Sequence, residues 1–444
     1  MDKYIEELKE ILRIPSVSAK AEHKPDMARA AEWLQKKLTS LDFSAQVMPT
    51  SFHPVVYAEN LTAGADKQTV MIYGHYDVQD QGDLSEWSSK PFEPEIRSGN
   101  IYARGTADDK GQLFTWIAAM EELKRGGHKL PVNVKFLIEG AEEEGSRGLS
   151  EFVEDNRSLL ACDVVLISDS HSLSETQPVI TYGLRGLAYM EVRLKALSTD
   201  VHSGIYGGNV MNPAVVLAQL IAKMKDEQGR VLIPGFYDQV RKIEKEEMEI
   251  LDQYPFTAED VMKETGAKAV FGEKGFSVPV RAGARPTLDV NGIWGGYQGE
   301  GAKTAIPGSV GAKISMRLVP HQTAADIEAK FTEFVKANIP EGIEVEITKL
   351  SGSEPVLFER QGKWFAAAEK ALLKTFGNKP VFELSGGSIG VTVDFKRILG
   401  VDSLLLGYGL PDDNLHGPNE KLSLSMFEKG VKTNMEFLSL LRPA

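Results

Sequence analysis

The chain has 444 residues, of which 42% are hydrophobic and 25% charged, and its formal net charge is −13 at pH 7. This length exceeds what one hydrophobic core usually serves, so two domains of unequal size are expected. The negative charge repels phosphate backbones and anionic lipids, and no block of lysines or arginines offsets it, which excludes nucleic acids and membrane surfaces as expected partners.

Helical and strand patterns alternate through the first part of the chain. Helices are predicted at residues 3–14, 25–40 and 110–125. Short apolar strands are predicted at residues 69–74, 132–138 and 163–168. The first helix mixes charges with apolar residues, unlike a signal peptide, and no apolar run approaches the ~20 residues that span a bilayer, so a cytoplasmic protein is expected. The alternation predicts an α/β domain with a mainly parallel twisted sheet flanked by helices.

A different order of elements begins near residue 183. An alternating strand at residues 187–197 is followed by a helix that starts at Asn212. Two further strands come next, at residues 287–293 and 311–319. A helix opened by Thr323 and a last strand at residues 343–350 complete the series. This β-α-β-β-α-β order is that of a ferredoxin-like sandwich, with an insertion at about 226–284. We therefore predict an inserted α+β domain at residues 184–352.

The remaining residues, 1–183 and 353–444, are predicted to form one catalytic, metal-binding domain. Its second part contains a helix near 360–376, a strand at 403–409 and a terminal helix opened by Ser425 and Glu428. This arrangement predicts that the chain leaves the first domain and returns to it.

Ionisable residues follow the predicted strands of the first domain directly. They are His75 and Asp77 after the first strand, Glu142 and Glu143 after the second, Asp169 after the third, and His416 in the loop after the strand at 403–409. Asp108 and Asp109 directly precede the helix at 110–125. Open α/β sheets place their ligands beyond the carboxyl ends of the strands, so these residues are expected to meet in one crevice.

Carboxylates crowded in a partly dry crevice raise one another's pKa unless cations compensate them. Imidazole and carboxylate without thiolate suit Zn²⁺ or Mn²⁺, with Co²⁺ as a further option, better than Ca²⁺. Five candidate ligands exceed the three protein ligands of a typical single catalytic zinc, and one carboxylate can bridge two ions ~3.5 to 4 Å apart. Two divalent metal ions are therefore expected, although each residue alone also fits a core, cap or turn position.

Five ordered motifs, GHYDV, RGTADDKG, EGAEEEGS, ISDS and LHGPNEKL, resemble the motif series of metallopeptidase family twenty over nearly the whole chain. This family includes carnosine-type and other cytosolic dipeptidases, acetylornithine deacetylase and succinyl-diaminopimelate desuccinylase. Four further motifs, DVHSGIYGG, GEGAKTAIP, RLVP and GGSI, are most similar to the dipeptidase branch.

The resemblance implies a role for each matching residue of the first domain. One metal ion would be held by His75, Asp169 and a bridging Asp108, and the other by Glu143, His416 and the same Asp108. Glu142 would be the general base, and Asp77 would orient the His75 ring. The resemblance also implies a cis peptide bond between Asp108 and Asp109.

The resemblance further implies substrate contacts from the inserted domain, which acts as a lid and a dimerisation domain in relatives. His202 would steady the developing oxyanion across the interface of a homodimer. Arg317 would hold the carboxylate of a small peptide substrate, a task suited to a guanidinium. Ser388, Gly387 and Thr304 would add further substrate contacts.

The leading hypothesis is hydrolysis of the peptide bond of a dipeptide or very short peptide by a water that bridges two metal ions. The nearest alternative is an N-acyl-amino-acid deacylase of the acetylornithine deacetylase or desuccinylase type, with the same metal core. A nucleotide-binding enzyme is disfavoured because the glycine-rich segment 295–304 lies between two strands and opens no helix. A non-catalytic binding protein is disfavoured because all five ligands and Glu142 are present.

Overall fold

A computed structural model describes residues 1–387 and 389–442. The chain divides into two compact units. Unit 1 comprises Met1–Tyr182, Phe358–Phe382 and Gly390–Ala444, and unit 2 comprises Gly183–Leu357 and Glu383–Ile389. Gly183 and two segments predicted for the first domain, 353–357 and 383–389, thus fall in unit 2. The pairing of Val356 with Leu184 and the packing of Gly386 against Arg185 explain this, because both contacts join residues of unit 2.

Unit 1 is built on a sheet whose strands follow the order β1-β2-β6-β3-β7-β17-β8. The bounds of these strands are β1 (Ser44–Met48), β2 (Val55–Asn60), β6 (Asn133–Glu139), β3 (Thr69–His75), β7 (Val164–Ile167), β17 (Ser403–Leu406) and β8 (Val179–Leu184). The four central strands, β6, β3, β7 and β17, are parallel, and the outer pairs are antiparallel. Nearly every residue of the central strands is buried, as in sheets covered on both faces.

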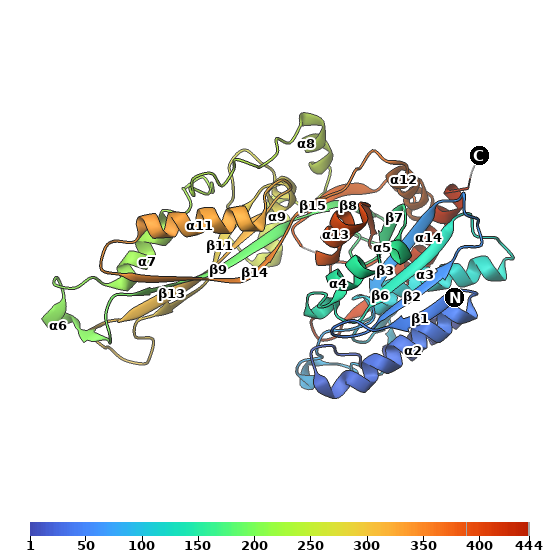
Figure 1. Cartoon of the computed structure of the whole chain (residues 1–444), viewed down its shortest axis with the longest axis horizontal. Coiled ribbons are helices and arrows are strands. Elements are labelled where there is room, and N and C mark those ends of the chain that lie inside the picture. Colours follow the sequence, from blue (N-terminus) through green and yellow to red (C-terminus); the bar gives the residue numbers. More distant parts are fainter. Residues whose placement is uncertain (388, 443–444) are drawn as a thin grey trace. The chain divides into compact units, whose positions relative to one another are not determined.

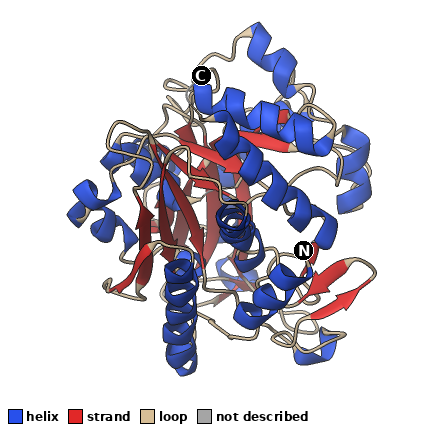
Figure 2. Ribbon diagram, turned by 90° about the vertical axis from the view of Figure 1, so that its right-hand side faces the viewer, coloured by secondary structure: helices blue, strands red, loops and turns tan. Residues whose placement is uncertain are grey.

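Helices flank this sheet (Figures 1 and 2). They are α1 (Asp2–Leu12), α2 (Lys24–Ser40), α3 (Lys110–Arg125), α4 (Leu149–Asp155), α5 (Arg157–Leu160), α12 (Lys363–Phe376), α13 (Gly390–Asp394) and α14 (Leu424–Leu440). Helix α2 packs along β1 and β2, while α3 packs against β3 and α14. These observations confirm the predicted α/β class with a parallel sheet centre. The predicted start of the last helix was wrong, because Ser423 is its N-cap and accepts a hydrogen bond from the Met426 N–H.

Short elements complete unit 1. They are the helical turns η1 (Ala21–His23), η2 (Leu84–Glu86), η3 (Glu142–Glu144) and η4 (Phe395–Leu399), and the strands β4 (Glu95–Arg97), β5 (Asn100–Tyr102) and β18 (Lys421–Ser423). The strands form a small sheet in the order β18-β5-β4. Because β18 pairs with β5, the segment around residue 416 is tied to the segment around residue 104.

Unit 2 contains a four-stranded antiparallel sheet in the order β11-β13-β9-β14. Its main elements are β9 (Gly186–Lys195), α7 (Pro213–Ala222), β11 (Thr287–Gly295), β13 (Ser309–Leu318), α11 (Ala324–Asn338) and β14 (Glu344–Ser353). Leu217 and Leu220 of α7 and Ile327 and Phe331 of α11 share one buried core with the sheet. This arrangement confirms the predicted ferredoxin-like order.

The smaller elements of unit 2 lie outside this core motif. They are β10 (Val201–His202), α6 (Ser203–Tyr206), α8 (Lys245–Leu251), α9 (Ala258–Thr265), α10 (Val278–Gly283), β12 (Ala305–Ile306) and β15 (Val356–Leu357), with β16 (Val381–Ser385) spanning the boundary of the units. Helices α8, α9 and α10 occupy the predicted insertion. In the part of the chain that the structure describes, no helix is both long and apolar enough to cross a bilayer.

Candidate metal centre

The parallel strands of unit 1 bring four predicted site residues to one edge of the sheet. His75 is the last residue of β3, Glu142 and Glu143 begin the turn η3 that follows β6, and Asp169 follows β7. Because β6, β3 and β7 are parallel neighbours, their carboxyl ends lie side by side.

Asp108 lies between two histidines and faces each with a different oxygen. Its Oδ1 is 3.0 Å from His75 Nε2, and its Oδ2 is 3.0 Å from His416 Nε2. Asp169 Oδ2 is 3.9 Å from His75 Nε2, and Glu143 Oε2 is 3.4 Å from His416 Nε2. The side chains thus form two groups of three, His75–Asp108–Asp169 and Asp108–Glu143–His416, whose ligand atoms all lie within 4.8 Å of one another.

The hydrogen bonds of His75 indicate that a cation fits this site. His75 Nδ1 is 3.0 Å from the backbone oxygen of Asp77, to which it donates its proton. Neutral His75 therefore turns the lone pair of Nε2 toward a carboxylate oxygen of Asp108, so that two acceptors face each other. A metal ion or an added proton resolves this conflict, and imidazole with carboxylate is a donor set suited to divalent metal ions.

The hydrogen bonds of Glu143 also indicate that a cation fits this site. Its Oε2 accepts a hydrogen bond of 2.8 Å from Gln79 Nε2. Its Oε1 is buried and has no hydrogen-bond partner among the residues that the structure describes. A buried oxygen without a donor is costly, and a bound cation would satisfy it. Sequence reasoning missed Gln79, which lies two residues after Asp77.

Asp77 connects two parts of the site. Its carboxylate is fully buried and accepts hydrogen bonds from the N–H groups of Glu142 (3.2 Å) and Glu143 (3.1 Å). Asp77 Oδ1 is also 3.4 Å from His75 Nδ1. The Asp77 side chain therefore fixes both the end of β3 and the turn η3. Glu142 is thereby held next to the candidate ligand Glu143, although Glu142 itself belongs to neither ligand group.

Asp109 directs its side chain toward the end of β3. It precedes α3, but its side chain makes no capping hydrogen bond there. Its Oδ2 accepts a hydrogen bond of 3.2 Å from the His75 N–H, and burial raises its pKa well above the ordinary value. The peptide bond between Asp108 and Asp109 is cis, as the resemblance implied.

A buried ion pair, missed by sequence reasoning, supports the loop that carries Asp108. Arg104 Nη1 donates to Glu420 Oε2 at 2.8 Å, and neither side chain is more than 2% exposed. Glu420 also accepts hydrogen bonds from the N–H groups of Gly105, Ala107 and Asp108. Arg104 Nη2 donates to the backbone oxygen of His416 at 3.1 Å. The pair therefore joins the segments that present both sides of the candidate site, and both residues lie within the quoted motifs RGTADDKG and LHGPNEKL.

We expect Glu420→Gln to weaken metal binding by about 10- to 100-fold, as removal of groups that orient ligands does. The glutamine amide would point a donor at other donors and would leave Arg104 without its anion, which also costs about 3–5 kcal/mol of stability. Calorimetric metal titration and thermal unfolding measure the two effects. Glu151→Gln, an exposed change on α4, is the matched control. Wild-type metal affinity in Glu420→Gln would contradict a positioning role.

The electrostatics of the metal-free site depend on burial and on the sharing of protons. Burial, with the nearby Asp108 charge, raises the pKa of Glu143 to about 7 and that of Asp169 to about 6. Burial also favours the neutral form of Asp108, but hydrogen bonds from His416 and His75 outweigh it and lower the Asp108 pKa. The same bonds raise the pKa values of both histidines, against the opposing effect of burial.

We expect the thermal stabilisation gained on adding metal to grow as the pH rises from 5 to 8. In the metal-free protein, Glu143, Asp169 and both histidines hold protons more tightly when folded than when unfolded, so stability falls as the pH rises through their raised pKa values. A divalent ion competes with these protons and therefore binds more tightly at higher pH. Melting temperatures with and without Zn²⁺ across this range test the trend, and a pH-independent difference would contradict it.

The remaining predicted site residues lie in unit 2. His202 ends β10, is exposed, and its Nδ1 accepts a hydrogen bond of 2.9 Å from the Gly204 N–H. Arg317 lies on β13 between the core residues Met316 and Leu318, so its side chain faces away from that core. Thr304 is exposed next to β12.

Two further residues were predicted in the segment 386–389. The Gly387 N–H donates to Ser385 Oγ at 3.2 Å, and Ser388 lies outside the described residues. The substrate-binding roles of these unit 2 residues stay predictions.

Comparison with known proteins places the chain in a family. A family profile described as peptidase family M20/M25/M40 matches residues 71–439. The Cys-Gly metallodipeptidase of Candida albicans is 36% identical, over 97% of this chain and 93% of that protein. The human Beta-Ala-His dipeptidase is 33% identical, over 97% and 88% of the respective chains. The crystal structure of an M20 family metallo-carboxypeptidase from Sulfolobus solfataricus has a TM-score of 0.86 at 33% identity and covers 100% of both chains. The two ligand groups, the shared fold and the similarity along almost the whole chain show that this protein belongs to peptidase family M20/M25/M40.

Proposed function

We propose that this protein is a metallo-exopeptidase that hydrolyses the peptide bond of dipeptides or very short peptides with two divalent metal ions. The observation that carries this function is the pair of ligand groups that share Asp108, with Glu142 next to Glu143 and outside both groups. The dipeptidase names of two similar proteins support dipeptides as the substrate class.

The two groups assign the ligands. His75, Asp108 and Asp169 would hold one ion, and Asp108, Glu143 and His416 would hold the other. Divalent ions bound there would lower the pKa of a water molecule, to ~7 for zinc, and would polarise the substrate carbonyl. Zn²⁺ or Mn²⁺, with Co²⁺ as a further option, fits the mixed imidazole and carboxylate donors.

Glu142 would act as general base and then as general acid. Its backbone N–H donates a hydrogen bond to Asp77. Its side chain belongs to neither ligand group. Burial raises its pKa well above the ordinary value in the metal-free protein, so its carboxylate can accept a proton. Glu142 would take a proton from the attacking water at a carboxylate oxygen and donate it to the departing amine.

Residues of unit 2 would recognise the rest of the substrate. Arg317 would bind the substrate carboxylate through paired N–H groups, with Gly387, Ser388 and Thr304 as further contacts. His202 would act across the interface of a homodimer on the developing oxyanion. Its exposed position on β10 is compatible with a contact to a second copy of the chain. A fully active monomer, by light scattering and assay, would rule this role out.

The test is a substrate panel with metal-stripped protein reloaded separately with Zn²⁺, Mn²⁺ or Co²⁺. The panel contains free dipeptides, tetrapeptides and N-acetyl amino acids. We expect the highest kcat/KM for dipeptides. A higher value for N-acetyl amino acids would identify a deacylase with the same metal core, and no hydrolysis of any member with any metal would refute the proposed function.

A further inference from the structure

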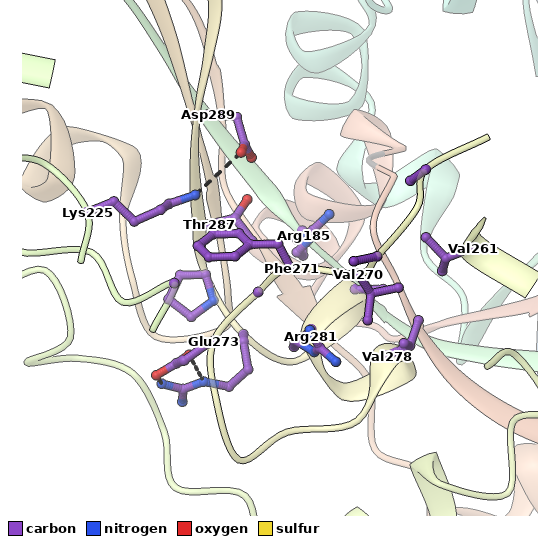
Figure 3. Close-up of a pocket in the computed structure, with 17 residues that line it drawn as sticks. Arg185, Lys225, Val261, Val270, Phe271, Glu273, Val278, Arg281, Thr287 and Asp289 are labelled. Carbon is purple, nitrogen blue, oxygen red and sulfur yellow. Dashed lines mark hydrogen bonds and ion pairs between the residues drawn. The ribbon is translucent and has the colours of Figure 1, made fainter. Parts of the chain in front are cut away.

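Unit 2 contains a pocket of about 460 Å³ that no residue of the candidate metal centre lines (Figure 3). Its walls come from β11, from α10 and from the segment 267–273 of the insertion. Val261, Val270, Phe271 and Val278 give it an apolar side. The volume lies within the range of ~300 to 1,000 Å³ that small-molecule sites occupy.

The charged residues that line this pocket carry an excess of positive charge in an acidic protein. Four are cationic, namely Arg185, Lys225, Arg281 and Arg285, and two are carboxylates, namely Glu273 and Asp289. Both carboxylates are already paired. Glu273 accepts two hydrogen bonds from Arg285, at 2.6 and 2.8 Å, and Asp289 is 3.5 Å from Lys225 (Figure 3). The pocket therefore keeps two guanidinium groups, those of Arg185 and Arg281, without a carboxylate partner among the described residues.

Arg185 carries a buried hydrogen-bond donor that a bound anion would satisfy. Its Nε is buried and has no hydrogen-bond partner in the described part of the chain. Burial and the nearby charge of Arg317 lower its pKa to about 10, with Asp289 partly offsetting them, so it is still a cation at neutral pH. A partly buried cation that forms no ion pair is unfavourable, and a bound anion would compensate it.

A glycine lies beside each of these guanidinium groups. A Cβ added to Gly386 would lie 2.8 Å from Arg185 Nη2, and one added to Gly272 would lie 2.8 Å from Arg281 Nη1. Backbone without side chains thus passes directly beside both groups. The lack of a side chain at Gly386 and Gly272 therefore leaves room for both guanidinium groups.

We propose that this pocket binds a small organic carboxylate, with Arg185 and Arg281 on the carboxylate and Val270, Phe271 and Val278 against an apolar body. Guanidinium groups match the planar, two-oxygen geometry of a carboxylate. The apolar side favours an organic acid over inorganic phosphate. The carboxylate could belong to an acidic side chain of a peptide substrate or to a separate free acid, and only the first source rests on the proposed function.

Calorimetric titration of the full-length, metal-loaded protein with 3-phenylpropanoate tests the site, with neutral 3-phenylpropanamide for comparison. We expect the acid to bind more tightly than the amide, and Arg281→Gln to weaken binding of the acid by roughly tenfold or more, since hydrogen bonds between charged groups are strong. Lys268→Gln, which removes an exposed cation from the same segment outside the pocket, should leave binding unchanged. Equal affinity for acid and amide, or unaltered acid binding in Arg281→Gln, would overturn the site.

Titration of two further variants with the acid tests the same pocket independently. Arg185→Gln should weaken binding as Arg281→Gln does, and the Arg281→Gln variant keeps the test valid if Arg185→Gln fails to fold. Arg317→Gln should leave acid binding in place, and loss of binding only in this variant would assign the acid to the predicted substrate site and overturn the pocket.

Dipeptide kinetics distinguish the two sources of the carboxylate. If the pocket receives an acidic side chain of the substrate, the acid should compete with a dipeptide that contains Asp or Glu, and Arg281→Gln should raise KM for that dipeptide with little change in kcat. If the ligand is a separate acid, inhibition should not be competitive and KM should stay unchanged in Arg281→Gln. A protein inactive on every dipeptide would refute the proposed function alone, because the calorimetric result needs no turnover.

Discussion

Glu142→Gln is expected to lower kcat for dipeptide hydrolysis by about 10²- to 10⁴-fold, the usual contribution of a positioned general base. The glutamine amide cannot accept the proton of an attacking water. The change should leave the fold intact, because only the backbone N–H of Glu142 bonds to Asp77. Metal content should also be retained, since Glu142 belongs to neither ligand group.

Steady-state kinetics together with metal analysis separate this role from a ligand role. Glu144→Gln is the matched control, because Glu144 lies in the same turn η3 and has no assigned function. The control should keep wild-type kcat and both metal ions. If Glu142→Gln keeps kcat within about tenfold of the wild type, Glu142 is not the base. If it loses metal as well as activity, Glu142 is a ligand or supports one.

Asp108→Ala should abolish activity and lower metal affinity by more than about 100-fold, beyond the loss caused by removing groups that only orient ligands. Asp108 is the one residue common to both ligand groups of the described chain. Its Oδ1 faces His75 and its Oδ2 faces His416. A single truncation therefore removes a donor from each metal position, whereas loss of Asp169 or Glu143 removes a donor from one.

Metal titration of the stripped protein gives the number of ions bound and their affinities. Asp155→Ala, an exposed change at the end of α4, is the matched control and should behave as the wild type. Two tightly bound ions in Asp108→Ala would show that Asp108 does not bridge them. Loss of one ion with the second retained would show that it serves a single position.

The amino-acid sequence determined the class of the fold because its signals are local. Continuous apolar runs predicted the buried parallel strands β3, β6 and β7, and alternating runs predicted the half-exposed strands of unit 2. Strand ends then predicted where His75 and Asp169 would meet, because the carboxyl ends of parallel strands share one edge of a sheet. The motif series predicted the family, which the comparisons show.

Several elements escaped sequence reasoning because their signals are weak. The sequence of strand β1, SAQVM, contains no apolar run, and none of its residues is fully buried. It was not predicted, although it pairs along its length with β2. Ser423 caps the last helix in preference to the predicted Ser425, a difference of half a turn that depends on where β18 ends.

Only the tertiary structure decided which distant residues act together. Arg104 and Glu420 are 316 positions apart, and their pairing depends on the small sheet that joins β5 to β18. Arg185 and Arg281 line one pocket because the insertion folds beside β11. Apolar periodicity reports how each segment meets its own neighbours. Long-range charge pairing and burial depend on the path of the whole chain, which no local pattern contains.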